Sequence, residues 1–255
     1  MTNPAALRAG QWAFIGLMLA LMALFIELGS WQTIRLAEKE ALIATVTERL
    51  HAAPLPLPAS GDWGDVEGFL YRPVSVEGRW LRDKTVLVFT SLMEPKAGPA
   101  SGPGYWVLVP FERADRSVVF VNRGFVPEAE AGRFRAGEGI TEEPVTVTGI
   151  ALKPEAVGSF TPAPDTAEGI DWVTNPARLA ALAGLDPATV APFTIDLPQN
   201  PAGGLPQGGE TVLDFPNNHL GYLLTWFGFA ALVPPLLWFW LRRQRRGPET
   251  PAQKP

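Results

Sequence analysis

Two apolar runs long enough to cross a membrane lie near the ends of this 255-residue chain, and they constrain its fold more than any other feature. The first covers residues 11–28 and is broken only by Glu27, whereas the second covers residues 219–241 without any Lys, Arg, Asp or Glu. Roughly 17 to 25 apolar residues cover the hydrocarbon core of a bilayer, so each run predicts a transmembrane helix. Bulky residues near position 28 make a poor signal-peptidase site, so the first helix is expected to be retained.

The short basic flanks of these runs predict the orientation of the chain. Arg8 precedes the first run, and four arginines lie between residues 242 and 246 after the second. Because basic flanks stay on the cytoplasmic side, residues 1–10 and the basic tail 242–255 are expected to be cytoplasmic. With only ten residues before the first run, we expect a multi-pass protein of a cell inner membrane with a periplasmic domain. The mitochondrial inner membrane is the alternative.

The segment between the spans is acidic, since residues 29–218 carry 15 Lys and Arg against 24 Asp and Glu. This excess of negative charge argues against a nucleic-acid partner. The basic tail is instead expected to contact anionic membrane lipid. The absence of cysteine from the sequence excludes disulfides, thiolate metal sites and cysteine nucleophiles.

The pattern of proline, glycine and apolar residues divides the translocated segment into three parts. Residues 29–58 predict an amphipathic stalk helix followed by a proline linker, because helical spacing gives way to prolines at its end. Residues 59–197 predict a β-rich domain, and residues 198–218 predict a Gly/Pro-rich tether. Strands are expected at residues 74–80, 85–89, 105–111, 118–122, 145–152 and 193–197, with one short helix at 176–185. The expected fold class is an α+β membrane protein, in which two terminal transmembrane helices flank a mostly antiparallel, barrel-like extracytoplasmic β domain.

The end of the strand at residues 118–122 carries two further expectations. Gly124 is expected to take a positive φ in a turn, because glycine lacks the Cβ that forbids it. Arg123 beside it suits a carboxylate or phosphate ligand, or an internal Asp or Glu, and the internal partner is favoured.

Enzyme chemistry finds little support in the sequence, which contains only two histidines, His51 and His219. A Ser-His-Asp triad would have to use one of them, and neither an HExxH pair nor a phosphate-binding glycine loop is present. We therefore expect no enzymatic activity. A membrane-anchored hydrolase is the remaining enzyme class.

His219 stands at the mouth of the second run and begins an aromatic stripe. At 3.6 residues per turn it shares a helix face with Tyr222, Trp226 and apolar residues that continue to Leu237. This face is suited to another helix or to a flat ligand. An intramembrane ionisable group is often functional, whereas an ordinary histidine and aromatic belt at the interface is the alternative.

Four segments, in order along the chain, resemble the Surfeit-locus protein 1 (Shy-one type) family of cytochrome c oxidase assembly factors. They are LGSWQTIR at 28–35, FLYRPVSVEG at 69–78, VNRGFVP at 121–127, and PNNHLGY at 216–222 with TWF at 225–227. Departures from the family pattern include Phe125 where Trp is usual and Gly221 where Gln is common. None of the departures falls on His219.

The resemblance implies a role in building the catalytic subunit of a haem-copper oxidase. It also implies transient binding of haem a, with His219 as an axial ligand of the iron and Tyr222 and Trp226 sheltering the porphyrin. Water, a histidine of a partner protein, or Met18 or Met22 is left open as the second ligand. Expected partners are that catalytic subunit, haem a synthase and membrane lipid. A structural scaffold for the oxidase subunit that binds no cofactor is the alternative function.

The expected topology is tested by reporter fusions. Alkaline phosphatase inserted within residues 198–209 should be active, because the enzyme matures only outside the cytoplasm, and a fusion after Gln253 should be inactive. The reverse pattern would contradict the orientation that the basic flanks predict.

Overall fold

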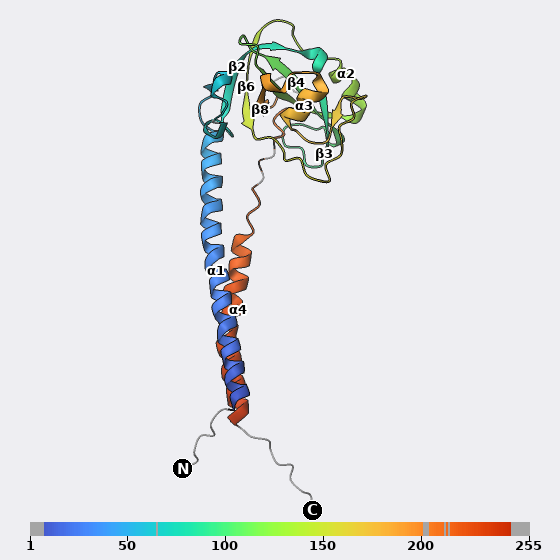
Figure 1. Ribbon diagram of the computed structural model, residues 1–255. Coiled ribbons are helices and arrows are strands. Elements are labelled where there is room, and N and C mark those ends of the chain that lie inside the picture. The colour runs from blue at the N-terminus through green and yellow to red at the C-terminus, as the bar shows by residue number, and fades with distance from the viewer. Residues whose placement is uncertain (1–7, 65, 201–203, 212, 214, 246–255) are drawn as a thin grey trace, which may run out of the picture. The chain divides into compact units, whose positions relative to one another are not determined.

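The computed structural model describes residues 8–64, 66–200, 204–211, 213 and 215–245 (Figure 1). The chain divides into two compact units, which are described in turn. A helix pair takes the described residues of 1–44 and 214–255, and a β domain takes those of 45–213.

The helix pair consists of α1, Ala9–Leu50, and α4, His219–Arg245. The expected first span and stalk helix are one continuous helix of 42 residues, because the sequence contains no proline between its ends. Both helices are long and apolar enough to cross a membrane, with mean hydropathies of 2.1 and 1.6 in their most apolar windows. Only 6% and 11% of those windows are buried, so their apolar side chains face outward as lipid-facing residues do.

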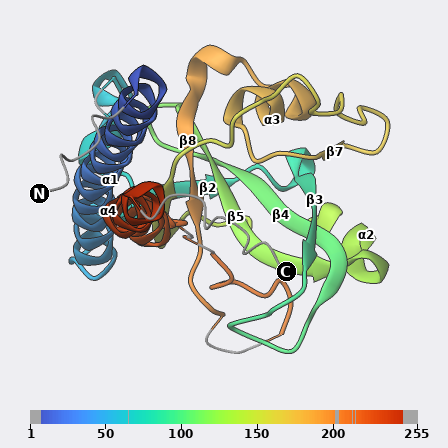
Figure 2. The ribbon, with the colours of Figure 1, turned by 90° about the horizontal axis from the view of Figure 1, so that it is seen from below.

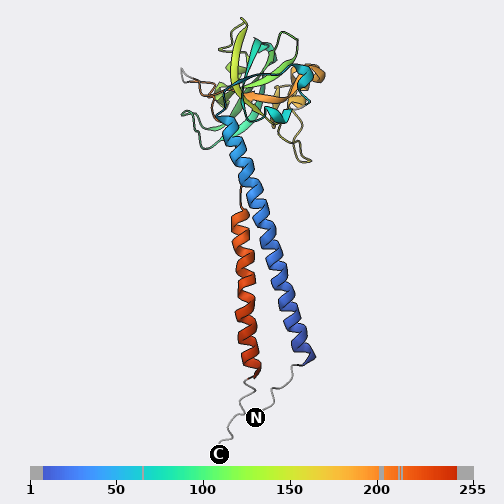
Figure 3. The same cartoon turned by 90° about the vertical axis from the view of Figure 1, so that its left-hand side faces the viewer.

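The two helices run antiparallel (Figure 3), and side-chain contacts between them define a seam. Ring contacts of 4.6 Å between Phe14 and Trp240 and of 5.9 Å between Phe25 and Trp226 mark its course. The less exposed residues recur at alternating steps of four and three, which is the spacing of a coiled-coil seam. On α1 they are Gln11, Ile15, Met18, Met22, Phe25, Gly29, Gln32, Leu36, Lys39 and Ile43, and on α4 they are His219, Leu223, Trp226, Ala230, Val233, Leu237 and Trp240.

The domain is built on one sheet that closes into a barrel (Figure 2). Its strands are β1 Leu55–Pro56, β2 Pro73–Trp80, β3 Val86–Leu92, β4 Gly102–Glu112, β5 Val118–Pro127, β6 Val145–Leu152, β7 Ile170–Asp171 and β8 Val190–Asp196. The order β2-β6-β8-β5-β4 returns to β2 through a β2–β4 pairing, which confirms the expected barrel-like domain. Five strand pairings are antiparallel, and β1–β2, β3–β7 and β5–β8 are parallel.

Both faces of the central strands β4 and β5 are covered, which explains their nearly unbroken apolar sequences. Val119 and Val121 point into one core with Phe111 and Phe193, whereas Phe120 points into a second core. In that second core, α3, Pro176–Ala183, packs on the sheet, and a third core forms beneath α2, Ala131–Arg135. The helix expected at 176–185 is therefore confirmed, with Asn175 as its N-cap and Gly184 as its left-handed C-cap.

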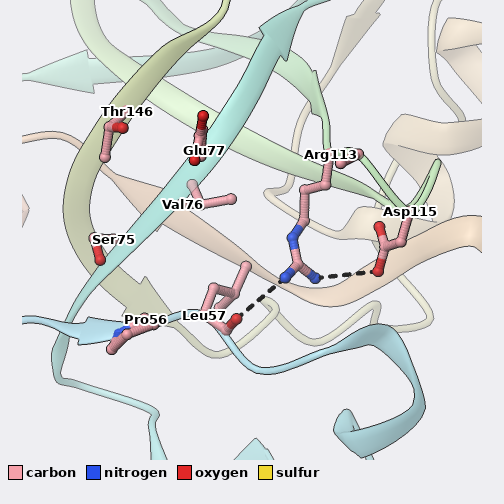
Figure 4. A pocket seen from close by; sticks show the side chains of 9 residues that line it. Pro56, Leu57, Ser75, Val76, Glu77, Arg113, Asp115 and Thr146 are labelled. Atoms are coloured by element: carbon pink, nitrogen blue, oxygen red, sulfur yellow. Dashed lines mark hydrogen bonds and ion pairs between the residues drawn. The ribbon is translucent and has the colours of Figure 1, made fainter.

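The domain begins earlier than the expected boundary at residue 59. Strand β1 pairs with β2, and Leu57 is buried in the core. Arg113 donates a hydrogen bond of 3.1 Å to the carbonyl of Leu57, which Figure 4 shows, and another of 2.9 Å to the carbonyl of Pro58. Prolines are tolerated here because β1 is an edge strand, which does not need every N–H. The expected proline linker is therefore part of the sheet.

The expected tether also packs on the domain over part of its length. Gln207 forms an antiparallel bridge with Phe125, with N···O distances of 2.8 and 2.9 Å. Glu210 is 1% exposed and accepts hydrogen bonds of 2.7 Å from the backbone N–H groups of Lys96 and Ala97. The glycines of this segment allow its backbone to approach the sheet closely. The composition alone had suggested a flexible tether. Residues 201–203, 212 and 214 of the tether lie outside the described residues.

Gly124 has the expected positive φ, 125°, but it lies in a bulge within β5 and not in a turn. The pairing shifts there by one residue, because Leu108 faces Asn122 while Trp106 faces Phe125. The prediction of an internal Asp or Glu partner for the neighbouring Arg123 is wrong, because no carboxylate of the described residues pairs with it. Arg123 donates to the carbonyls of Glu138 and Gly139 at 2.9 and 3.0 Å, and burial lowers its pKa.

A Cβ at Gly124 should destabilise the domain. It would overlap the backbone carbonyl of Gln207 and would hold a non-glycine residue at positive φ. Gly124→Ala should therefore lower the free energy of unfolding by at least about 1–3 kcal/mol in thermal or denaturant unfolding. Gly132→Ala is the matched control, since Gly132 lies in α2 with open space around it. Equal stability of the two variants would contradict this account of the bulge.

Candidate functional site

His219 is the first residue of α4, and the residues before it make the helix begin there. The Asn218 carbonyl accepts the first helical hydrogen bond, from the N–H of Tyr222, and the Asn217 side chain accepts from the N–H of His219 at 3.4 Å. Asparagine at such positions satisfies N–H groups that lack helical partners. The start of the helix thereby places His219 at the first seam position of α4.

The imidazole of His219 is held by Gln32 of α1. Its Nδ1 lies 2.7 Å from Oε1 of Gln32, whose residue is only 7% exposed. An amide oxygen can only accept a hydrogen bond, so Nδ1 carries the proton and donates it. In the neutral imidazole the proton-free nitrogen is then Nε2, which has no hydrogen-bond partner among the described residues. Such a nitrogen is the one that a neutral histidine offers to a metal.

The expected aromatic stripe divides between two surfaces. Trp226 lies on the seam with His219, and its ring meets those of Phe25 and Phe229. Tyr222 lies beside the seam and is 57% exposed. This face was expected to meet either another helix or a flat ligand. In the structure its Trp226 meets another helix, α1. The structure thus separates Trp226, which packs against α1, from the exposed Tyr222, and the role of both residues beside His219 stays a prediction.

Met18 and Met22 do not come near His219. They occupy seam positions 14 and 10 residues before Gln32, which at 1.5 Å per residue corresponds to about 21 and 15 Å along α1. Within this helix pair, neither methionine is a second ligand of an iron at His219.

Close packing of the two helices supports the contact between Gln32 and His219. A Cβ on Gly29 would lie 2.9 Å from the ring of Phe227, so glycine permits this approach one turn from Gln32. The Thr33 hydroxyl bonds the carbonyl of Gly29 at 3.1 Å. Neither Gln32 nor Gly29 stands out individually within the sequence segment at 28–35. The heptad spacing was the available signal, because it places Gln32 at a seam position facing the start of α4.

His51 does not contribute to a comparable site. Its Nδ1 contacts the Thr47 carbonyl at 2.8 Å in the last turns of α1, and the residue is exposed. Within the described part of the chain, no cluster of three His, Asp or Glu side chains is placed to bind a metal ion.

Asp196 is a buried carboxyl group beside a polar cavity of about 310 Å³, which the buried Glu210 also lines. Asp196, at the end of β8, accepts a hydrogen bond of 2.8 Å from the hydroxyl of Thr211. Burial raises the pKa of Asp196 to about 6, against the opposing effect of hydrogen bonds from Thr211 and Asn122. The hydrogen bond joins the segment after Glu210 to the barrel wall, so the group has a structural role.

The raised pKa of Asp196 predicts a loss of stability as pH rises. Because the folded-state pKa of about 6 exceeds the unfolded value near 3.8, the free energy of unfolding should fall between about pH 4 and 6. The loss attributable to Asp196 is at most on the order of 3 kcal/mol. Asp196→Asn should remove it and unfold at a higher temperature than the parent at pH 7.5. Asp83→Asn, at an exposed position, is the control, and matching pH profiles for parent and Asp196→Asn would refute the assignment.

Comparison with known proteins identifies the family. A family model described as the SURF1 family matches residues 19–231, which include both Gln32 and His219. The SURF1-like protein of Monosiga brevicollis is 36% identical over 226 residues, covering 85% of this chain and 83% of the relative. That of Drosophila melanogaster is 34% identical over 251 residues, covering 93% and 80%. Surfeit locus protein 1 of Homo sapiens is 31% identical over 223 residues, covering 83% and 72%. The chain therefore belongs to the SURF1 family.

Proposed function

We propose that this protein assists the assembly of a haem-copper cytochrome c oxidase by holding haem a transiently at His219 and passing it to the catalytic subunit. Membership of the SURF1 family supports the role in assembly. The hydrogen bond between Gln32 and His219 carries the haem step, because it leaves Nε2 free of a proton. A neutral imidazole nitrogen is the usual protein ligand of haem iron.

The surroundings of His219 fit an apolar, flat cargo. The residue begins the apolar span, so a porphyrin bound there would meet apolar side chains and its farnesyl tail would enter lipid. The seam beyond His219 is filled by Trp226 and Phe25, which leaves the outer surface near Tyr222 and Leu220 for the ring. We therefore assign the shelter of the porphyrin to Tyr222, and to Trp226 only a packing role.

Transfer requires that the cargo be released. One protein ligand, with water or a partner's histidine on the other side of the iron, binds haem more weakly than two fixed ligands would. Haem a synthase is the proposed donor and the oxidase subunit the acceptor. We place both termini in the cytoplasm and the β domain in the periplasm of a cell inner membrane, and we propose no enzymatic activity.

A structural scaffold is the second candidate, and one observation favours it. Gln32 and His219 form a polar pair at facing seam positions, and polar pairs at such positions fix the register of paired helices. His219 would then hold α1 and α4 in register, and its loss would lower the amount of protein without involving haem.

Substitution of His219 separates these two functions. In protein purified from cells that make haem a, His219→Ala should lower the Soret absorption by more than about tenfold. Loss of an outer-shell partner alone costs about 10- to 100-fold in metal affinity, and loss of the ligand itself should cost at least as much. The amount of inserted protein should be unchanged. His219→Met should retain more haem than His219→Ala with shifted bands, because methionine also ligates iron. His51→Ala is the matched control and should bind haem normally.

Two outcomes would contradict the haem proposal. Full Soret absorption and full oxidase activity in both His219 variants would exclude His219 as a ligand. Parallel loss of inserted protein and of haem in both variants would instead indicate the scaffold function.

A further inference from the structure

We infer that Gln32 is a positioning residue that holds His219 with its proton on Nδ1 and thereby presents Nε2 to the iron. The inference deepens the proposed function and rests on it for the identity of the metal. The tautomer itself follows from the helix pair alone. Nothing in the sequence motifs assigns this role to Gln32.

The hydrogen bond is short and shielded from water. Its Nδ1–Oε1 distance is 2.7 Å, Gln32 is 7% exposed, and His219 is half-buried. In such surroundings a hydrogen bond is stronger than in water, and an unpaired buried donor is costly. The nitrogen that makes this bond is therefore fixed, and the other nitrogen faces the ligand.

Rotation of the imidazole is also restricted by this bond. Ligating histidines generally donate their second N–H to an oxygen acceptor, which orients the ring and increases its electron donation to the metal. Gln32 supplies that acceptor from the facing helix, where the ring of Phe227 packs against Gly29 one turn away. Asparagine at this position is shorter by one carbon–carbon bond, about 1.5 Å, and would not reach Nδ1.

The first experiment needs no haem. Full-length protein labelled with ¹⁵N-histidine in detergent micelles should show His219 with a protonated Nδ1 and an unprotonated Nε2. Gln32→Leu and Gln32→Asn should lose this single tautomer, whereas Gln32→Glu should keep it because a carboxylate also accepts. Gln11→Leu is the matched control, since Gln11 is also a seam glutamine and contacts Gln244 at the other end of the pair.

The second experiment measures bound haem a. Gln32→Leu should weaken haem binding by about 10- to 100-fold, the usual effect of losing an outer-shell partner. The reduction potential of the bound haem should rise in Gln32→Leu and fall in Gln32→Glu, because the acceptor controls electron donation by the imidazole. A purely structural role of Gln32 does not predict opposite shifts for the two variants.

The outcomes distinguish this inference from the function on which it rests. Protonated Nε2 in the parent, or an unchanged affinity and potential in Gln32→Leu, would overturn the role of Gln32. Failure of the parent to bind haem a would overturn the proposed function, while the nitrogen spectrum would still decide the tautomer of His219.

Discussion

The antiparallel seam between α1 and α4 is the constraint on which the rest of the helix pair depends. It joins segments from the two ends of the chain, and its steps of four and three place the less exposed side chains of each helix on one face. Gln32 and His219 interrupt this apolar seam with a polar pair. A buried polar pair is costly when either partner is missing, so the seam determines the register of the helices and the orientation of the imidazole together.

The domain follows a different principle, since its barrel closes by strand pairing between β2 and β4 and not by contact between ends of the chain. Both of its connecting segments are fastened to the sheet. Arg113 holds the segment at Leu57 and Pro58, and Glu210 holds the loop at Lys96 and Ala97. These contacts use backbone N–H and C=O groups, so they tolerate many side chains at the positions that they bind.

Sequence patterns predicted those parts of the fold that depend on local periodicity. The spans, the strands of the barrel and the helix at α3 were all readable, because apolar spacing follows the geometry of each element. The packing of the segment around Gln207 could not be predicted, because glycine and proline are as typical of a flexible linker as of a backbone that lies close to a sheet. The parallel pairing of β5 with β8 is non-local and leaves no trace in either strand. At the candidate site, the sequence pointed to His219 because it is an ionisable group at the start of an apolar run. The role of Gln32 could be recognised only once the register between the two helices was known.

The central claim, that His219 ligates haem iron through Nε2, is tested most directly by the iron–imidazole stretching vibration. Resonance Raman spectra of ferrous haem a bound to the full-length protein would be recorded with natural and ¹⁵N-labelled histidine. The account predicts a band that shifts with the label in the parent and in His51→Ala and that is absent in His219→Ala. A band that persists in His219→Ala, or one that ignores the label in the parent, would contradict it.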